Sequence, residues 1–211
     1  MTRSPARTPS CRSRRLRSRR VVRVSALKAS LDGPTDNTRQ HGRTEQHLAG
    51  SGLAYAVLRP HFFVQNLLGM LGSIRAEGKI YFGTGKGKLG MVDTRDVSDA
   101  VVATVLTDAF DGGIHELTGP ESIDFDQVAA AVGRGLGKDV QFVPVPPTAV
   151  AETVRAHGGD AWTADLLRDY STAYASGFGD FTTGEVERIT GKPPRSLDRF
   201  IEEVLVPAAR G

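Results

Sequence analysis

The sequence has 211 residues, of which 39% are hydrophobic and 24% are charged, the composition of an ordinary globular domain. A chain of this length fits one domain, or one domain with an attached lobe. No apolar run approaches the roughly 18 to 20 residues that a membrane-spanning helix needs. We therefore expect no membrane association.

The formal net charge of +3 comes from one end of the chain. Residues 1–20 contain eight arginines and no acidic residue, whereas the rest carries 19 basic and 24 acidic side chains. We predict a disordered basic tail at 1–20, with an RNA- or membrane-binding arm or a misassigned start as alternatives. The acidic body gives no reason to expect nucleic-acid binding. The single cysteine, Cys11, excludes an intrachain disulfide and is typical of a cytoplasmic protein.

The first part of the body alternates between strand and helix patterns. Gly50 and Gly52 end the first helix, and Pro60 ends the strand after it. Strand, helix and strand together predict one right-handed parallel βαβ unit. The predicted elements are a strand at 21–25, a loop at 32–37, a helix at 39–49 and a strand at 53–58.

Further along, the strand pattern stops at about Pro146 and only helical patterns remain. We therefore predict an α/β fold with a parallel sheet at 21–145 and a mostly helical, substrate-side lobe at 146–211. The predicted strands are 79–82, 89–92, 113–118 and 140–143. The predicted helices are 62–77, 93–107 with Val97, Val101 and Val105 on one stripe, one capped by Asp124 and Gln127, and four starting near Thr148, Asp160, Thr182 and Ser196.

A literal G-x-G-x-x-G pattern occurs at Gly85, Gly87 and Gly90. A dinucleotide fingerprint needs a strand before the glycines and a helix immediately after them. A strand pattern follows here instead, so we interpret these glycines as a mobile hairpin loop with Lys86 and Lys88 exposed. The sequence then offers no recognisable phosphate-binding turn.

Three pieces of sequence occur in a familiar order: VVRVSALKAS; HGRTE ahead of SGLAYAVLRPHFFVQNLL; and MVDTRDVSDAVVATVL leading to HELTGPESIDFDQVAAAVG. Together they resemble the NmrA-like family of atypical short-chain dehydrogenase/reductases, which are NAD(P)-binding Rossmann proteins. The resemblance covers about residue 19 to the end. That family opens with a strand, a glycine-rich turn and a helix, followed by three further strands, and none of these is in this sequence. The resemblance therefore implies a partial Rossmann-like sheet that lacks its first strands and contacts only the nicotinamide side of NAD(P).

The resemblance also implies where chemistry occurs. Short-chain dehydrogenases use a Tyr and a Lys four residues later, and His41 and Glu45 stand at the matching places. Residues at i and i+4 share a helix face, so the carboxylate could orient the imidazole for proton donation. The alternatives are a solvated helix face, or a family member that senses the cofactor without catalysis.

The cofactor contacts expected from the family lie at the ends of two strands. Ser25 falls where the family's backbone passes the nicotinamide ribose, and the turn at 59–62 borders the nicotinamide. Ser25 could instead be a plain strand-end residue, and Arg59 could pair with Asp93 or Asp96. The expected cofactor-binding residues are Ser25, Arg59, Pro60, His61 and Phe62.

Candidate substrate contacts are Phe63, Asn66 and Trp162. Each has a structural alternative: Phe63 could be core, Asn66 could cap the turn, and Trp162 could belong to a core stripe with Tyr170 and Tyr174. The five histidines show no zinc-binding spacing, so no metal site is predicted.

These patterns predict part of an NAD(P)H-dependent oxidoreductase that in its intact form reduces a small quinone-like or carbonyl compound. The chain by itself is expected to bind the cofactor weakly or not at all. The alternatives are a non-catalytic NAD(P)-responsive regulator and an inactive fragment. An unpaired edge at 21–25 would favour self-association.

Overall fold

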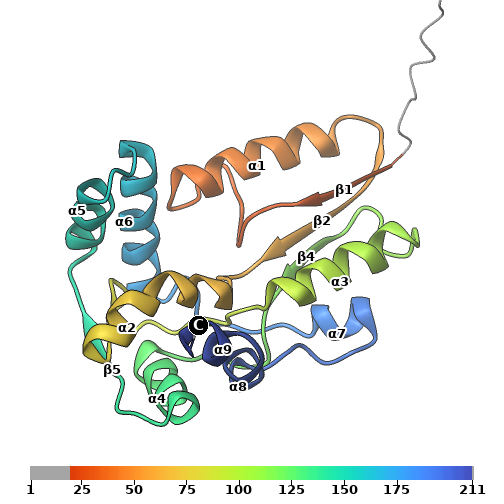
Figure 1. The fold of residues 1–211 in the computed structure, drawn as a ribbon. Coiled ribbons are helices and arrows are strands. Elements are labelled where there is room, and N and C mark those ends of the chain that lie inside the picture. Colours follow the sequence, from red (N-terminus) through yellow and green to blue (C-terminus); the bar gives the residue numbers. More distant parts are fainter. Residues whose placement is uncertain (1–19, 211) are drawn as a thin grey trace, which may run out of the picture.

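The computed structural model describes residues 20–210, and the predictions for residues 1–19 lie outside this range. Its strands form two parallel sheets, where the sequence suggested one (Figure 1). The first sheet has the order β1 (Arg20–Val24), β2 (Ala54–Pro60), β4 (Ile114–Leu117), and the second pairs β3 (Lys79–Phe82) with β5 (Gln141–Pro144). The predicted α/β class with parallel strands is confirmed. Arg20, assigned above to the tail, instead begins β1.

Helices make up about half of the chain. A 3₁₀ helix, η1, and a π-helical turn, η2, interrupt the α-helices. The elements are α1 (Asp36–Ala49), η1 (Val64–Met70), α2 (Leu71–Glu77), α3 (Thr94–Val105), α4 (Phe125–Leu136), α5 (Pro147–Ala156), α6 (Ala161–Ala175), α7 (Glu185–Thr190), α8 (Leu197–Phe200), η2 (Ile201–Leu205) and α9 (Val206–Arg210). None of them is both long and apolar enough to cross a membrane.

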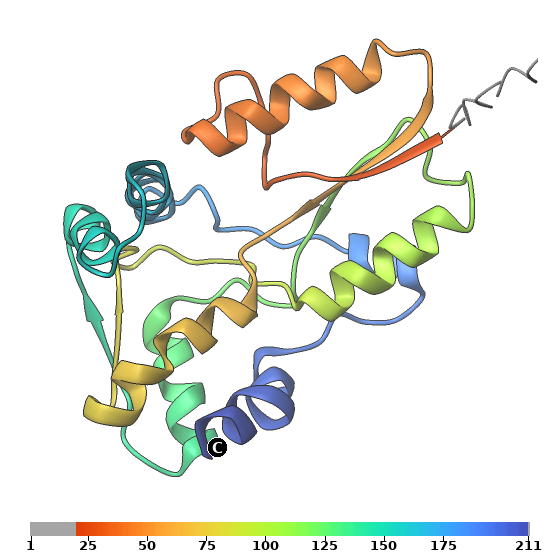
Figure 2. The same ribbon diagram turned by 45° about the horizontal axis from the view of Figure 1, so that its top comes forward.

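Helices cover both faces of the three-stranded sheet. Successive strand residues point to opposite faces: on β2, Leu58 packs in a cluster with residues of α3, whereas Arg59 bonds to Glu45 of α1. Figures 1 and 2 both show α1 and α3 on either side of the sheet. β1 forms one edge, and among residues 20–210 only β2 pairs with it. Self-association through this edge stays a prediction.

The first helix begins three residues earlier than predicted. Thr35 is its N-cap and accepts a hydrogen bond from the backbone N–H of Thr38, whose hydroxyl in turn accepts from the N–H of Thr35. This reciprocal pair satisfies two otherwise unpaired donors. Asp36 and Asn37, predicted to lie in a loop, are therefore helical.

The predicted helix over 62–77 was wrong at its start. Phe62 and Val64 are tied to a neighbouring segment, because the carbonyl of Phe62 accepts from the N–H of Val92 and the N–H of Val64 donates to the carbonyl of Val92. These bonds keep 61–63 extended, and η1 starts only at Val64. The predicted strand at 89–92 forms only two isolated bridges, Phe63 with Val92 and Leu89 with Ile123.

Two further details differ from the predicted pattern. On α3 the buried face is formed by Val97, Ala100 and Thr104, while Val105 is 57% exposed. Helix α7 begins at Glu185 rather than near residue 182. Thr183 explains the delay, because its hydroxyl donates to the carbonyl of Glu116 and holds this segment beside β4.

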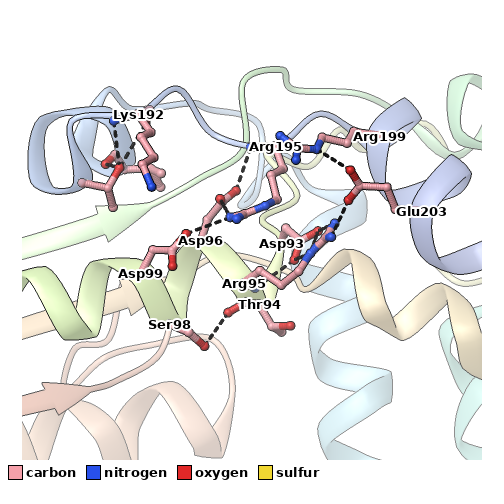
Figure 3. Close-up of polar contacts among 12 residues, drawn as sticks. Asp93, Thr94, Arg95, Asp96, Ser98, Asp99, Lys192, Arg195, Arg199 and Glu203 are labelled. Carbon is pink, nitrogen blue, oxygen red and sulfur yellow. Dashed lines mark hydrogen bonds and ion pairs between the residues drawn. The ribbon is translucent and has the colours of Figure 1, made fainter.

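The helices after residue 146 pack in two different places. α5 and α6 pack on each other, whereas α7 packs on α3 and α8 packs on α4 (Figure 1). Ion pairs join the segment 195–203 to the start of α3, as Figure 3 shows. Arg195 bonds to Asp96 and Asp99, and Arg95 bonds to Asp93 and Glu203.

Candidate functional site

A pocket of about 230 Å³ opens where β1 and β2 end, and we call it the strand-end pocket. The two strands run parallel in register, Val24 opposite Leu58, and the N–H of Ser25 donates to the carbonyl of Leu58 at 2.7 Å. In open parallel sheets, ligands bind at the carboxyl ends of the strands. The lining residues are Ser25, Ala26, Leu27, Asn37, Pro60, His61, Phe62, Phe63, Asn66, Phe82, Leu166, Leu167, Tyr170 and Tyr174.

Behind the pocket, the two residues proposed for catalysis meet at Ser25 and not at each other. The Ser25 hydroxyl donates to the carboxylate of Glu45 and lies 3.2 Å from Nδ1 of His41. Arg23 Nη2 also contacts that Nδ1, at 3.1 Å. Because a guanidinium only donates, Nδ1 is the acceptor, and the neutral ring carries its proton on Nε2. His41 and Glu45 do not line the pocket, so either can reach it only through Ser25.

Burial lowers the pKa of His41 below its ordinary value, and Arg23 lowers this pKa further, while Glu45 raises it. The imidazole is therefore mainly neutral at pH 7. The expectation that Glu45 orients His41 directly was wrong, because Arg59 binds both oxygens of the Glu45 carboxylate.

Arg59 lies at the centre of a largely buried ion cluster. Its Nε donates to Glu45 at 3.0 Å, its Nη1 donates to Glu116 at 3.0 Å, and its Nη2 donates to the carbonyl of Ala29. Burial lowers the pKa of Arg59, but the bonds to the two carboxylates outweigh it, so the pKa is raised. Pairing of Arg59 with Asp93 or Asp96, the alternative named above, does not occur. Arg59 supports the strand end from behind and does not line the pocket.

His61 lines the pocket with both ring nitrogens already bonded. Nδ1 accepts from the N–H of Phe62 at 2.7 Å, and Nε2 contacts the carbonyl of Gly179 at 2.9 Å. This pairing places the proton on Nε2. Its ring stacks on Tyr174 with centroids 6.2 Å apart. His61 is 2% exposed, so it presents a fixed neutral ring to any ligand.

We expect His61 to stay neutral across the physiological range. Burial lowers the pKa of His61, and the bond to Gly179 raises it by a smaller amount. The net result is a fall from 6.5 to about 4. A folded-state pKa below the unfolded value means that the unfolded chain binds more protons between these pH values. Stability should therefore fall as the pH drops from 6.5 towards 4. The measurement is an NMR titration of the His61 Cε1–H signal, and a midpoint near 6.5 would contradict the assigned bonding.

The three predicted substrate contacts have different outcomes. Phe63 and Asn66 line the strand-end pocket. The side-chain amide of Asn66 makes no hydrogen bond within the described part of the chain, and η1 has no side-chain cap. Trp162 lies outside the lining: it is 49% exposed, and its Nε1 donates to Asp36 at 3.1 Å. Tyr170 and Tyr174, which share its helix, do reach the pocket.

Sequence reasoning missed Asn37 and Phe82 as lining residues. Phe82 ends a correctly predicted strand, β3, so the strand-end rule could have identified it. Asn37 was assigned to a loop, and no local signal marked it. Its amide donates to the hydroxyl of Tyr170 at 3.0 Å, which joins the first turn of α1 to α6.

The glycines at 85, 87 and 90 form a packed loop rather than a phosphate-binding turn. A Cβ on Gly87 would collide with the carbonyl of Tyr174, and one on Gly90 with the carbonyl of Phe181. The next helix, α3, starts only at Thr94. Lys86 is exposed, as predicted, and pairs with Asp126 at 2.6 Å.

The chain has relatives in both sequence and fold, although no family model matches it. The chain is 32% identical over 190 residues to the uncharacterized oxidoreductase YesF of Bacillus subtilis and 28% identical over 182 residues to the NAD(P)H azoreductase of Xenophilus azovorans. These matches cover 89% and 85% of this chain. The chain spans 64% and 63% of the length of these two relatives.

Solved structures show the same fold. The NADPH-dependent quinone oxidoreductase QOR2 of Escherichia coli, complexed with NADPH, superposes with a TM-score of 0.81 at 22% identity, covering 89% of this chain and 66% of that one. NmrA, described as a negative transcriptional regulator in complex with NAD, gives a TM-score of 0.67 at 16% identity. The match covers 91% of this chain and 66% of that one.

The parallel strands, and the pocket at their carboxyl ends, define an α/β protein of the Rossmann type. Its sequence and structure relatives include proteins named as NAD(P)H-dependent oxidoreductases and NmrA itself. The resemblance to the NmrA-like family of atypical short-chain dehydrogenase/reductases is therefore confirmed by relatives in sequence and in fold.

Proposed function

We propose that this chain supplies the nicotinamide and substrate side of an NAD(P)H-dependent oxidoreductase that reduces a small quinone-like or other carbonyl compound. The observation that carries the proposal is the meeting of two adjacent parallel strand ends at one pocket, with Ser25 on one end and the turn 60–63 on the other. The names of the relatives support the cofactor class. Bound NAD(P)H would supply the hydride.

The chain's own residues would position the ring and move one proton. Phe62, Phe63 and the neutral His61 offer flat, uncharged surfaces for a nicotinamide ring. When hydride adds to the acceptor's carbonyl carbon, the Ser25 hydroxyl turns from Glu45 and gives its proton to the carbonyl oxygen. His41 protonated on both ring nitrogens then returns a proton from Nδ1 to Ser25, 3.2 Å away, and in that form it gives up the contact that Arg23 Nη2 makes with the neutral ring. Because the pKa of His41 is lowered, this return is favoured by mildly acidic solution.

The described residues fit the nicotinamide better than the pyrophosphate. A phosphate prefers a helix N-terminus whose N–H groups are free and whose surroundings are not acidic. Helices α1, α3 and α4 each carry an aspartate at the cap or in the first turn: Asp36, Asp93 and Asp124. These carboxylates would repel a pyrophosphate. The arrangement supports contact with the nicotinamide side only.

The experiment compares NADPH with the reduced nicotinamide nucleoside, which lacks the pyrophosphate, by calorimetric titration of this chain. We expect both to bind weakly and within about tenfold of each other, because the phosphates gain no oriented donors. NADPH binding at micromolar affinity, far tighter than the nucleoside, would contradict the nicotinamide-only proposal.

A paired variant shows whether the nucleoside occupies the strand-end pocket. Leu166→Trp places a large ring in that pocket from α6, whereas Leu106→Trp adds the same ring at an exposed site. We expect binding to be lost only in Leu166→Trp. If neither variant binds less nucleoside than the parent chain, the site assignment is wrong.

A second candidate is an NAD(P)-responsive regulator without turnover. His41 and Glu45 at the positions of the family's Tyr and Lys favour it, and NmrA shares the fold. Reduction of a quinone that His41→Ala abolishes would decide for the enzyme. Nucleotide binding by the parent chain without reduction of any quinone or aldehyde would favour the regulator.

A further inference from the structure

Helices α5 and α6 pack on each other, and we call the two of them, residues 147–175, the helical hairpin. Figures 1 and 2 both show it to one side of the three-stranded sheet, with the start of α1 beside α6. Its ion pairs are internal: Asp165 pairs with Arg155 and Arg168, and Arg168 also pairs with Asp169. In the described chain no ion pair joins the helical hairpin to the rest of the protein. It is therefore built as a separate unit.

Both connections of the helical hairpin to the rest of the chain lie at one end, because a short turn links α5 to α6 at the other. At the connected end α6 packs closely: a Cβ on Gly83, just after β3, would collide with Ser171. The chain enters through Val145, whose N–H donates to the carbonyl of Phe82 at 3.1 Å. It leaves through Gly177, where φ is +84° and nothing lies within 4 Å of an added Cβ. Glycine adopts this backbone readily, so the second connection is free to turn.

Two hydrogen bonds tie α6 to the first turn of α1, and we call them the latch. Nε1 of Trp162 donates to the carboxylate of Asp36 at 3.1 Å, and the amide of Asn37 donates to the hydroxyl of Tyr170 at 3.0 Å. In the described chain the helical hairpin makes no other hydrogen bond to the protein, apart from bonds to the three residues that flank it at each end. Trp162 is 49% exposed, so water competes with Asp36 for its N–H. The latch is therefore weak.

Two cavities separate the helical hairpin from the rest of the protein. The strand-end pocket, of about 230 Å³, has residues of α6 in its lining. A second cavity, of about 560 Å³, lies between the helical hairpin and the elements η1 and β3. Protein interiors leave few voids larger than a water molecule, so this boundary is not a tightly packed core. The helical hairpin can therefore shift without breaking one.

We propose that the helical hairpin is a hinged lid on the strand-end pocket, and that Asp36 and Asn37 hold it shut. Small-molecule sites measure roughly 300 to 1,000 Å³, and the shut pocket is smaller than this. Because α6 forms one wall, turning of the lid about Val145 and Gly177 enlarges the pocket. A ligand enters when the latch breaks and is enclosed when the latch forms again. The lid acts on any ligand of this pocket, so the inference goes beyond the proposed function.

The two ends of α6 move by different amounts in this motion. Tyr174 lies next to the hinge and stacks on His61, so it moves least. Trp162 lies roughly 18 Å further along α6, at 1.5 Å per residue, so it moves furthest. The latch bond at Trp162 therefore holds the part of the lid that travels most.

The first experiment measures how fast a thiol in the pocket reacts with 5,5′-dithiobis(2-nitrobenzoate). The full chain carries Cys11→Ser, which removes its one native cysteine. Ala26→Cys then places a thiol in the lining of the strand-end pocket, where Ala26 is 8% exposed. Ala129→Cys, at a residue of α4 that is 2% exposed, is the matched control for opening elsewhere.

Asn37→Ala and Tyr170→Phe remove the same latch bond, one from each side. We expect either change to raise the reaction rate of the Ala26→Cys chain about fivefold, because a buried thiol reacts only in the open state. Neither should change the rate of the Ala129→Cys chain. Thr44→Ala, on α1, removes a hydroxyl that bonds only within that helix, and it should leave both rates unchanged.

The chain's one tryptophan gives a second measurement that needs no introduced thiol. Asn37 bonds to Tyr170 and not to Trp162, so Asn37→Ala changes the surroundings of Trp162 only if α6 moves as a whole. We expect acrylamide to quench Trp162 fluorescence more strongly in Asn37→Ala than in the parent chain. Equal quenching, or equal pocket-thiol rates in the parent and both latch variants, would overturn the proposal. A matching rise in the Ala129→Cys chain would also overturn it, because the variants would then loosen the whole fold.

Discussion

Replacing Arg59 with methionine is expected to destabilise the protein by about 3–5 kcal/mol at pH 7, because it leaves two largely buried carboxylates without their cation. The side chains of Arg59, Glu45 and Glu116 are 14%, 8% and 21% exposed. Methionine keeps most of the aliphatic volume, so the effect reports the charge. Urea denaturation with a two-state fit gives the change in the free energy of unfolding.

The same substitution should be less harmful in acid. Burial already raises the pKa of Glu116 above 4.5, more than Arg59 lowers it, and removal of Arg59 raises it further. A carboxyl whose folded-state pKa is raised costs stability above that pKa and loses this cost as the pH falls to the unfolded value. The deficit should therefore shrink towards pH 4.5. Arg134→Met removes an exposed pair with Asp198 and should cost less than about 1 kcal/mol.

A triple variant gives the sharpest control for this cluster. Arg59→Met combined with Glu45→Gln and Glu116→Gln removes all three charges together. Replacing a whole buried ion cluster is often close to neutral, whereas breaking it is costly. We expect the triple variant to be more stable than Arg59→Met. If it is less stable, unpaired buried charge is not the cause of the loss.

The substitution Asp93→Ala is expected to cost about 2–4 kcal/mol, the sum of a lost helix cap and lost charged hydrogen bonds. Asp93 is fully buried; it accepts from the backbone N–H of Arg95 at 2.8 Å, from Gln65 at 2.8 Å, and from the Arg95 guanidinium. Figure 3 shows that the Arg95 guanidinium also pairs with Glu203, which lies in η2. Removing Asp93 therefore weakens both the start of α3 and its link to the carboxyl-terminal helices.

The matched control is Asp124→Ala at the start of α4. Asp124 also caps a helix, with Gln127 as its reciprocal partner, but it makes no ion pair in the described chain. Loss of the cap by itself should cost about 1 kcal/mol. Equal losses of stability in the two variants would contradict the role given to the ion pairs of Asp93.

The stability that Asp93 contributes should depend on pH. Burial raises the pKa of Asp93, but its hydrogen bonds and its ion pair lower it by more, so the pKa lies below 3.8. The contribution of Asp93 to the free energy of unfolding is therefore complete above pH 3.8, and it is lost as the pH falls through the lowered pKa.

Local patterns in the sequence were sufficient for much of the fold. The cap at Asp124 and the helix starts at 93–94 and at Ser196 were predicted correctly, because a helix start depends on residues within one helical turn. Strand β3 was predicted at its observed bounds. The parallel pairing of β1 with β2 followed from the length of the connection between them.

The errors arose where distant segments compete with local preference. The stretch 62–63 has helical spacing, yet bonds from Phe62 and Val64 to Val92 keep it extended. Residue 183 stays out of α7 because its hydroxyl reaches Glu116. These partners lie far away in the sequence, so no local window contains them.

The sequence by itself determined the α/β class, the family, and the two strand ends that carry Ser25 and the turn 60–63. The tertiary structure decided which side chains meet there. It joined Glu45 to Arg59 rather than to His41, and it left Trp162 outside the pocket. Periodicity and capping depend on neighbours along the chain, whereas a site depends on contacts between elements, and those contacts form only when the chain packs.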